Sequence, residues 1–135
     1  MRRRKIIVLL VFAVLVVLGV SLFLYFRPKP LIQEVDSCEL SQIVYRGKEI
    51  TDKTVYEDVL QVLSRYKSRA SLETVHSYPT ENLVAEINGN DNGKPFHIVL
   101  GETNFKYEHA GGFLQKIMDG EDLLDEIEKI LQDSN

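Results

Sequence analysis

Three histidines are the side chains best suited to metal or acid–base chemistry in this chain of 135 residues. His76, His97 and His109 fall on separate predicted strands, without the i, i+4 helical spacing or the Cys/His pairings that mark zinc sites. His97 and His109 lie 12 residues apart in neighbouring strands, where the two rings could face each other. The pattern as a whole favours structural or surface imidazoles, so we predict no metal site.

An asparagine- and glycine-rich segment, residues 88–93, carries a second group of possible ligands. Its amide side chains alternate as in a calcium loop, but an EF-hand loop closes with a glutamate at position 12 and is flanked by helices. Here position 12 is Val99 and the flanking segments are predicted strands. The two Asn-Gly steps of the segment favour a hairpin turn instead.

Nucleophiles and carboxylates show no catalytic arrangement. The sequence has no Gly-x-Ser-x-Gly motif and no glycine-rich phosphate loop before a helix. The single cysteine, Cys38, stands near Asp36 and Glu39, and neighbouring carboxylates raise a thiol pKa rather than lowering it. Carboxylate pairs such as Glu57-Asp58 lie opposite the apolar stripe of a predicted helix, as solvated faces do. We therefore predict no catalytic residue, cofactor or metal, with a cell-surface hydrolase as a remote alternative.

Cys38 also bears on how the chain is held together. One cysteine excludes an internal disulfide, and the 105 residues after Pro30 are enough to fold on apolar burial alone. We expect Cys38 to be a half-buried strand residue, and a disulfide between two chains stays an alternative.

The elements that position these residues belong to the α+β class. Runs of β-forming residues between Gly- and Asn-rich turns predict strands at 37–45, 71–78, 83–87, 96–100, 105–109 and 113–118. We expect about five strands in one antiparallel meander, with Phe105, Tyr107 and His109 on one face.

Two amphipathic helices complete the predicted domain. The first is expected near residues 52–68, where Thr54 and Glu57 fit a capping box. The second starts near Gly120 behind an Asp119 cap, and its apolar face is formed by Leu123, Leu124, Ile127, Ile130 and Leu131. The element order is β-α-β-β-β-β-α, with one or both helices on one face of the sheet.

An apolar run of 21 residues, 6–26, is the strongest signal in the sequence. It contains 17 residues of the types Leu, Ile, Val and Phe and no charge, and as a helix it would be roughly 32 Å long, which matches a bilayer core. We interpret it as an uncleaved transmembrane signal-anchor helix through which the chain binds membrane lipid.

The run has two other interpretations, a cleaved signal peptide and a lipoprotein. A cleaved signal peptide has a shorter apolar region and ends in small residues, and only Gly19 and Ser21 resemble such a site here. A lipoprotein is less favoured, because Cys38 lies 12 residues beyond the run.

The flanking charges predict the orientation of the chain. Four basic residues precede the run and two follow it closely, so the positive-inside rule places the N-terminus in the cytoplasm. We expect a basic cytoplasmic segment at 1–5, the membrane helix at 6–26, a short linker at 27–36 and an extracytoplasmic domain at 37–135. The predicted location is the cell membrane, with a single pass.

Charge also limits the partners of the domain. Residues 31–135 carry ten basic and twenty acidic residues, a net charge of −10. Nucleic-acid binding needs a basic surface, so we exclude it. We expect the acidity to serve solubility and to keep the domain away from anionic headgroups.

The combination of a membrane-proximal segment, an Ile50-Thr51-Asp52 helix start, aromatic strand residues, a Gly111-Gly112 turn and a closing amphipathic helix resembles small extracytoplasmic domains of unknown function from Gram-positive bacteria. Such domains are anchored by a helix or a lipid. The resemblance covers about 100 residues. It implies a location and an architecture, and it carries no active site.

The function that these observations favour is a non-enzymatic, membrane-anchored domain that binds a protein or cell-envelope partner. An exposed edge strand would be a natural docking place. The alternative is an accessory or immunity-type modulator that acts on an integral-membrane protein through its transmembrane helix.

Overall fold

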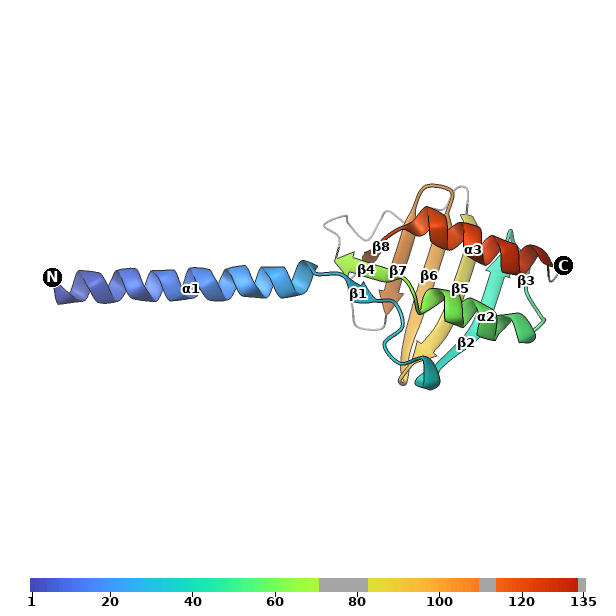
Figure 1. The fold of residues 1–135 in the computed structure, drawn as a ribbon, viewed down its shortest axis with the longest axis horizontal. Coiled ribbons are helices and arrows are strands. Elements are labelled where there is room, and N and C mark those ends of the chain that lie inside the picture. The colour runs from blue at the N-terminus through green and yellow to red at the C-terminus, as the bar shows by residue number, and fades with distance from the viewer. Residues whose placement is uncertain (71–82, 110–113, 134–135) are drawn as a thin grey trace.

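The chain is described by a computed structural model, which covers residues 1–70, 83–109 and 114–133. A long N-terminal helix projects from a domain in which two helices cover one face of a sheet (Figure 1). The helices are α1 (Arg2–Phe26), α2 (Thr54–Leu63) and α3 (Gly120–Asp133), with a short 3-10 helix, η1 (Val35–Ser37). The strands are β1 (Lys29–Pro30), β2 (Cys38–Tyr45), β3 (Lys48–Glu49), β4 (Lys67–Ala70), β5 (Leu83–Asp91), β6 (Lys94–Gly101), β7 (Phe105–His109) and β8 (Gln115–Ile117).

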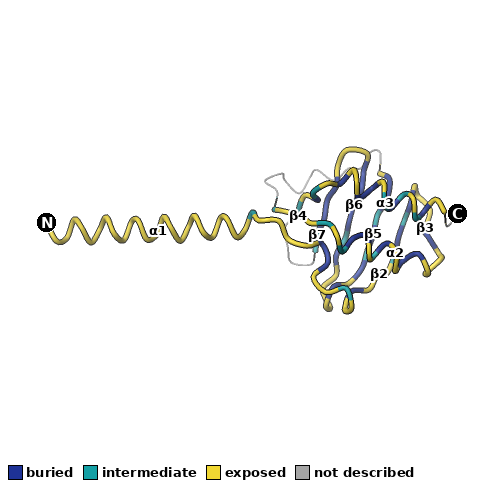
Figure 2. The backbone as a smooth tube through the Cα atoms, viewed as in Figure 1, coloured by how far each residue is buried: buried dark blue, intermediate teal, exposed yellow. Residues whose placement is uncertain are grey.

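The apolar part of helix α1 has no polar face, and the helix meets the domain only at its C-terminal end, next to β4. None of its 25 residues is buried (Figure 2). A water-soluble helix of this length would bury an apolar stripe, which α1 lacks. Among the described residues it is the one helix that is long and apolar enough to cross a membrane.

The eight strands form one antiparallel sheet in the order β1-β4-β8-β7-β6-β5-β2-β3. The predicted α+β class and antiparallel sheet are confirmed, but the expectation of about five strands is wrong. The strands that sequence reasoning missed are β1, β3 and β4, which have two, two and four residues. Segments so short show no periodicity, and only their pairing partners make them strands.

The first domain helix is shorter than the predicted 52–68. It ends at Leu63, because residues 67–70 pair with β8 as strand β4. Its start is capped by Asp52, whose Oδ1 accepts hydrogen bonds from the Thr54 N–H (3.0 Å) and the Thr54 hydroxyl (2.6 Å). These bonds lower the pKa of Asp52. Asp52 therefore provides the side-chain cap, in place of the expected capping box between Thr54 and Glu57.

The two Asn-Gly steps have different roles. Asn92 (φ 51°) and Gly93 (φ 80°) form the expected hairpin turn between β5 and β6. Gly89 instead lies inside β5, where an added Cβ would come within 2.6 Å of the Glu39 carbonyl oxygen and 2.8 Å of the Phe96 ring. The predicted strand at 71–78 and the Gly111-Gly112 turn lie outside the described residues.

The core lies between α2, α3 and the sheet face that they cover. The expected apolar face of α3 is confirmed, since Leu123, Ile127 and Leu131 are fully buried. They form one cluster with Val59 and Leu63 of α2 and with apolar residues of the central strands β2, β5 and β6. Burial of this apolar area is the main force that holds the helices on the sheet.

The segment after α1 is part of the domain, and this corrects the linker expected at 27–36. Lys29 and Pro30 pair with β4, and the Leu31 N–H donates to the Tyr66 carbonyl at 3.0 Å. Leu31 and Ile32 are 1% and 3% exposed. Only Arg27 and Pro28 separate α1 from the sheet, so the helix is joined to the domain by a very short connection.

Candidate functional site

A hollow on the domain lies where η1 and the start of β2 meet α2. It has a volume of about 330 Å³. Its walls are formed by Val35, Asp36, Cys38, Leu40, Tyr56, Glu57, Leu60 and Gln61. We call it the β2–α2 groove.

The groove runs along an incompletely paired edge of the sheet. Strand β3 pairs with β2 only at Val44 and Tyr45, and the next contact on that side is the bond from the Ile50 N–H to the Ile43 carbonyl (2.8 Å). Among the described residues, no strand lies beside residues 38–42 on their outer side. Peptide groups on such an edge can pair with an added strand.

Two features partly guard this edge. The pairing of β2 with β5 shifts register between Leu40 and Gln42, which marks a bulge at Ser41. The Lys53 ammonium group also donates to the Ser41 carbonyl at 3.5 Å. Bulges and edge lysines are common protections against uncontrolled strand pairing. The stretch from Cys38 to Leu40, which borders the groove, has neither.

Negative charge gathers at the groove. Asp36 and Glu57 line it, and Asp91 pairs with Cys38 across β5 and β2. Asp91 is 8% exposed; its Oδ2 accepts the Gln33 N–H at 2.8 Å, while its Oδ1 has no hydrogen-bond partner among the described residues. A buried carboxylate with one unsatisfied oxygen keeps much of its field. The groove therefore favours cationic groups.

The pKa of the Cys38 thiol responds to this negative charge. Burial, then Asp91, then Glu39 raise its pKa from 9.0 to about 11. A thiol with such a pKa is ionised to only about 1 part in 10⁴ at pH 7, too little for an efficient nucleophile. The expected effect of a neighbouring carboxylate is confirmed for Glu39, but Asp36 is not among the causes of the shift, and the larger charge effect comes from Asp91. The expected half-burial is wrong, because Cys38 is only 5% exposed.

The histidines do not come together. In the β6–β7 register Phe96 pairs with His109 and His97 pairs with Glu108, so the two imidazoles lie on opposite faces of the sheet. The expected shared face of Phe105, Tyr107 and His109 is confirmed, and the Tyr107 and His109 rings are 5.8 Å apart. His76 lies outside the described residues. Within the described parts of the chain, no group of three or more His, Cys, Asp or Glu could hold a metal ion.

Two carboxylates of α3 have structural partners that sequence reasoning missed. Glu128 accepts the Tyr45 hydroxyl at 3.1 Å and pairs with Arg46 at 2.9 Å. Glu126 accepts the Tyr66 hydroxyl at 2.7 Å, and this contact together with burial raises the pKa of Tyr66 to about 12. These contacts of Glu126 and Glu128 hold α3 against β2 and against the end of α2. They therefore stabilise the packing of the helix and are not evidence of a ligand site.

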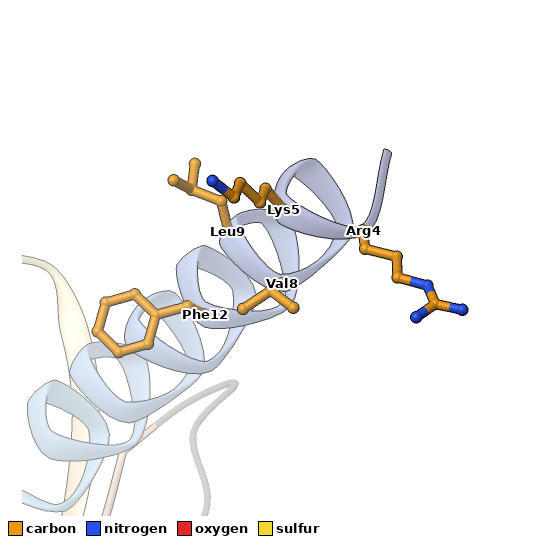
Figure 3. Close-up of a pocket in the computed structure, with 5 residues that line it drawn as sticks. All are labelled: Arg4, Lys5, Val8, Leu9 and Phe12. Atoms are coloured by element: carbon orange, nitrogen blue, oxygen red, sulfur yellow. The ribbon is translucent and has the colours of Figure 1, made fainter. Parts of the chain in front are cut away.

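A second hollow lies on α1 and carries no site. Figure 3 shows its side chains, Arg4, Lys5, Val8, Leu9 and Phe12, all on one isolated helix. No second element provides an opposite wall, and in a bilayer the apolar part of this surface would be covered by lipid chains.

Comparison of the chain with known protein families, curated proteins and solved structures finds no match. Function is therefore inferred from the geometry of the groove and of helix α1.

Proposed function

We propose that the protein is a single-pass membrane protein whose domain binds an extended segment of a partner protein in the β2–α2 groove. Helix α1 supports the anchor, because none of its residues is buried and it is of membrane-spanning length. The four basic residues before the apolar run support a cytoplasmic N-terminus and an outward-facing domain. This arrangement agrees with the resemblance to small anchored extracytoplasmic domains.

The observation that carries the proposal is the unpaired outer side of β2 at residues 38–42, directly beside the groove. A partner segment that adds to this edge would pair with peptide groups that have no neighbouring strand among the described residues. Its alternate side chains would point into the groove, where Leu40 and Leu60 offer an apolar contact. Main-chain pairing would give affinity, and the groove would give specificity.

The charges of the groove define the chemistry of the partner. Asp36 and Glu57 line it, Asp91 lies behind it, and no basic residue is part of its wall. A lysine or arginine in the partner segment would therefore be favoured over an acidic residue. We propose an extended segment with a basic side chain at the position that faces the groove.

Site-specific photo-crosslinking in cells tests this proposal. A photoreactive residue replaces Gln61 in the groove or, as a control, exposed Asp125 on α3. We expect one reproducible protein adduct from position 61 and none from position 125. Mass spectrometry should locate the adduct in a segment with a basic residue. Recovery of lipid alone, or the same adduct from both positions, would refute docking in the groove.

Charge reversal sharpens the test. Glu57→Lys should reduce the adduct at position 61 about tenfold or more, since it replaces an attractive charge by a repulsive one. Asp58→Lys changes the same charge on the same helix, but Asp58 is exposed and does not line the groove, so the adduct should persist. Equal losses in both variants would point to non-specific electrostatics.

Exchange of the membrane helix separates this proposal from the alternative of action through the membrane segment. Replacement of residues 6–26 by an unrelated apolar helix should leave the adduct at position 61 unchanged. Its disappearance would favour a modulator whose working element is α1.

A further inference from the structure

The side of the domain nearest α1 has the opposite charge to the groove. Figure 1 shows β1, β4 and β8 on the side of the sheet where α1 enters. The exposed basic residues of this side are Arg27, Lys29, Lys67, Arg69 and Lys116. We call them the basic edge. Strands β1, β4 and β8 contain no acidic residue, although residues 31–135 carry a net charge of −10.

These cations are not neutralised within the described part of the protein. The ion pairs of the described residues are Arg46 with Glu128 and Arg65 with Glu126, and neither includes a member of the basic edge. Arg69 and Lys116 are moreover directly opposite each other in the β4–β8 register. Like charges at such a position destabilise a sheet. An external anion between them would remove this cost.

The connection to α1 determines which anions are near. Only Arg27 and Pro28 lie between Phe26, the end of α1, and Lys29, the start of β1. Three residue steps span at most about 11 Å, and the headgroup layer of a bilayer is roughly 5 to 8 Å thick. Adjacent strands add about 5 Å each. The nearest members of the basic edge are therefore held within about one Debye length of the lipid surface, where attraction to anionic headgroups is weakly screened.

We propose that the basic edge binds the anionic headgroups of the bilayer that α1 spans, and that this contact fixes the tilt of the domain. This inference rests on the anchor of the proposed function and is independent of the groove. It also revises the expectation that the acidic domain is repelled by anionic lipid. The net charge is negative, but the charge that faces the headgroups is positive.

Strand order gives the contact a consequence for the groove. The basic edge and the β2 edge lie at opposite ends of the strand order. A domain that rests on headgroups through β1, β4 and β8 holds the β2–α2 groove away from the lipid. The groove is then accessible to a partner in the aqueous phase.

Paramagnetic relaxation in nanodiscs tests the lipid contact. The full chain, labelled with ¹⁵N, is placed in nanodiscs that carry a gadolinium chelate on a few headgroups. One set contains 30% phosphatidylglycerol and the other only phosphatidylcholine. We expect the relaxation enhancement at the amides of residues 67–70 and 115–117 to be at least twofold larger with phosphatidylglycerol, and to fall to the phosphatidylcholine level in 0.5 M salt. Equal enhancement in both lipids would overturn the proposal.

Charge variants identify the residues. The double change Arg69→Glu and Lys116→Glu should abolish the dependence on phosphatidylglycerol, and the Arg69→Gln variant, which only removes the charge, should weaken it. Lys48→Glu makes the same kind of charge change at the opposite edge, in β3, and should have no effect. All these residues are exposed, and an unchanged amide spectrum would verify the fold of each variant. If Lys48→Glu acts as strongly as the double change, net charge rather than the basic edge is responsible.

The nanodisc experiment separates failure of the lipid contact from failure of the proposed function. A chain that does not incorporate into nanodiscs would refute the anchor itself. A chain that incorporates but shows no lipid dependence would refute only the basic edge. Glu57→Lys should leave the relaxation pattern unchanged, because the groove is not part of the lipid contact.

Discussion

The two edges of the single sheet differ in both backbone and charge. At one edge, β1 has two residues and includes Pro30, which has no N–H to donate. At the other, β2 extends along residues 38–45 and β3 covers only its last two positions. The first edge is a poor template for an added strand, and the second is a good one. One sheet can thus present two surfaces of different use.

The two edges also differ in the sign of their charged side chains. The basic edge adjoins α1 and has no ion pair among the described residues, whereas the β2–α2 groove is lined by Asp36 and Glu57. Segregation of opposite charges to opposite edges gives the domain an electric polarity that its net charge hides. We expect this polarity to orient the domain between the membrane and a partner.

The largest expected effect comes from breaking the sheet beneath the groove. Gly89→Val would place a branched side chain against the Glu39 carbonyl oxygen and the Phe96 ring, where even a Cβ comes within 2.6 and 2.8 Å. We expect a loss of about 3 kcal/mol in the free energy of unfolding, because the β2–β5–β6 packing must open. Urea denaturation of the full chain in detergent measures it.

Asn90→Ala is the matched control for this change, since Asn90 is the exposed neighbour of Gly89 in β5. Its effect should stay within about 0.5 kcal/mol. A valine at position 89 that is tolerated equally well would show that the β2 edge is looser than the structure describes.

A smaller effect is expected when the hydrogen bonds that hold α3 near each edge of the sheet are removed one at a time. Tyr66→Phe removes the 2.7 Å bond to Glu126 near the basic edge, and we expect a loss of about 1 to 2 kcal/mol. Tyr45→Phe removes the longer 3.1 Å bond to Glu128 and the bonds that the Tyr45 hydroxyl accepts from Arg46 Nε (3.1 Å) and Gln132 Nε2 (3.5 Å). Glu128 retains Arg46, and Arg46 and Gln132 are exposed to water, so this variant should cost about 0.5 to 1 kcal/mol. Thermal unfolding of both variants measures the difference. The reverse ranking would mean that α3 is held mainly at the β2 side.

The smallest effect probes the negative field of the groove without disturbing its shape. Asp91→Asn should lower the pKa of Cys38 from about 11 but leave it above 9.0, because burial is the larger cause. Glu39→Gln should lower it less, and Glu108→Gln, on the helix-free face, should not change it. The pH dependence of iodoacetamide alkylation of the full chain gives these values. No change in the Asp91 variant would remove the evidence for a field at the groove.

The same pKa gives stability a defined pH dependence. The folded state keeps the Cys38 proton up to about pH 11, whereas an unfolded thiol loses it near 9.0. The native chain therefore binds more protons between these values, and the unfolding free energy should fall as the pH rises from about 9 to 11. Burial and Asp91 raise the pKa of Tyr107 to about 12, so its contribution is lost at still higher pH.

Local patterns in the sequence determined a large part of this protein. The apolar run, the amphipathic face of α3, the Asn92-Gly93 turn and the strand Phe105–His109 were all predicted, because each depends on residues within one or two turns or one hairpin. The raised pKa of Cys38 was predicted in direction for a similar reason, since a neighbouring carboxylate, Glu39, is one of its causes.

Tertiary structure decided the features on which function depends. Lys29 becomes a strand residue only because Ser68 lies opposite it, and Arg69 and Lys116 form one basic surface only because β4 pairs with β8. The groove likewise joins η1, β2 and α2. Such juxtapositions depend on pairing between residues far apart in the chain. Local periodicity carries no information about that pairing, and so the sequence could define the apolar N-terminal helix and the last helix but not the two edges of the sheet.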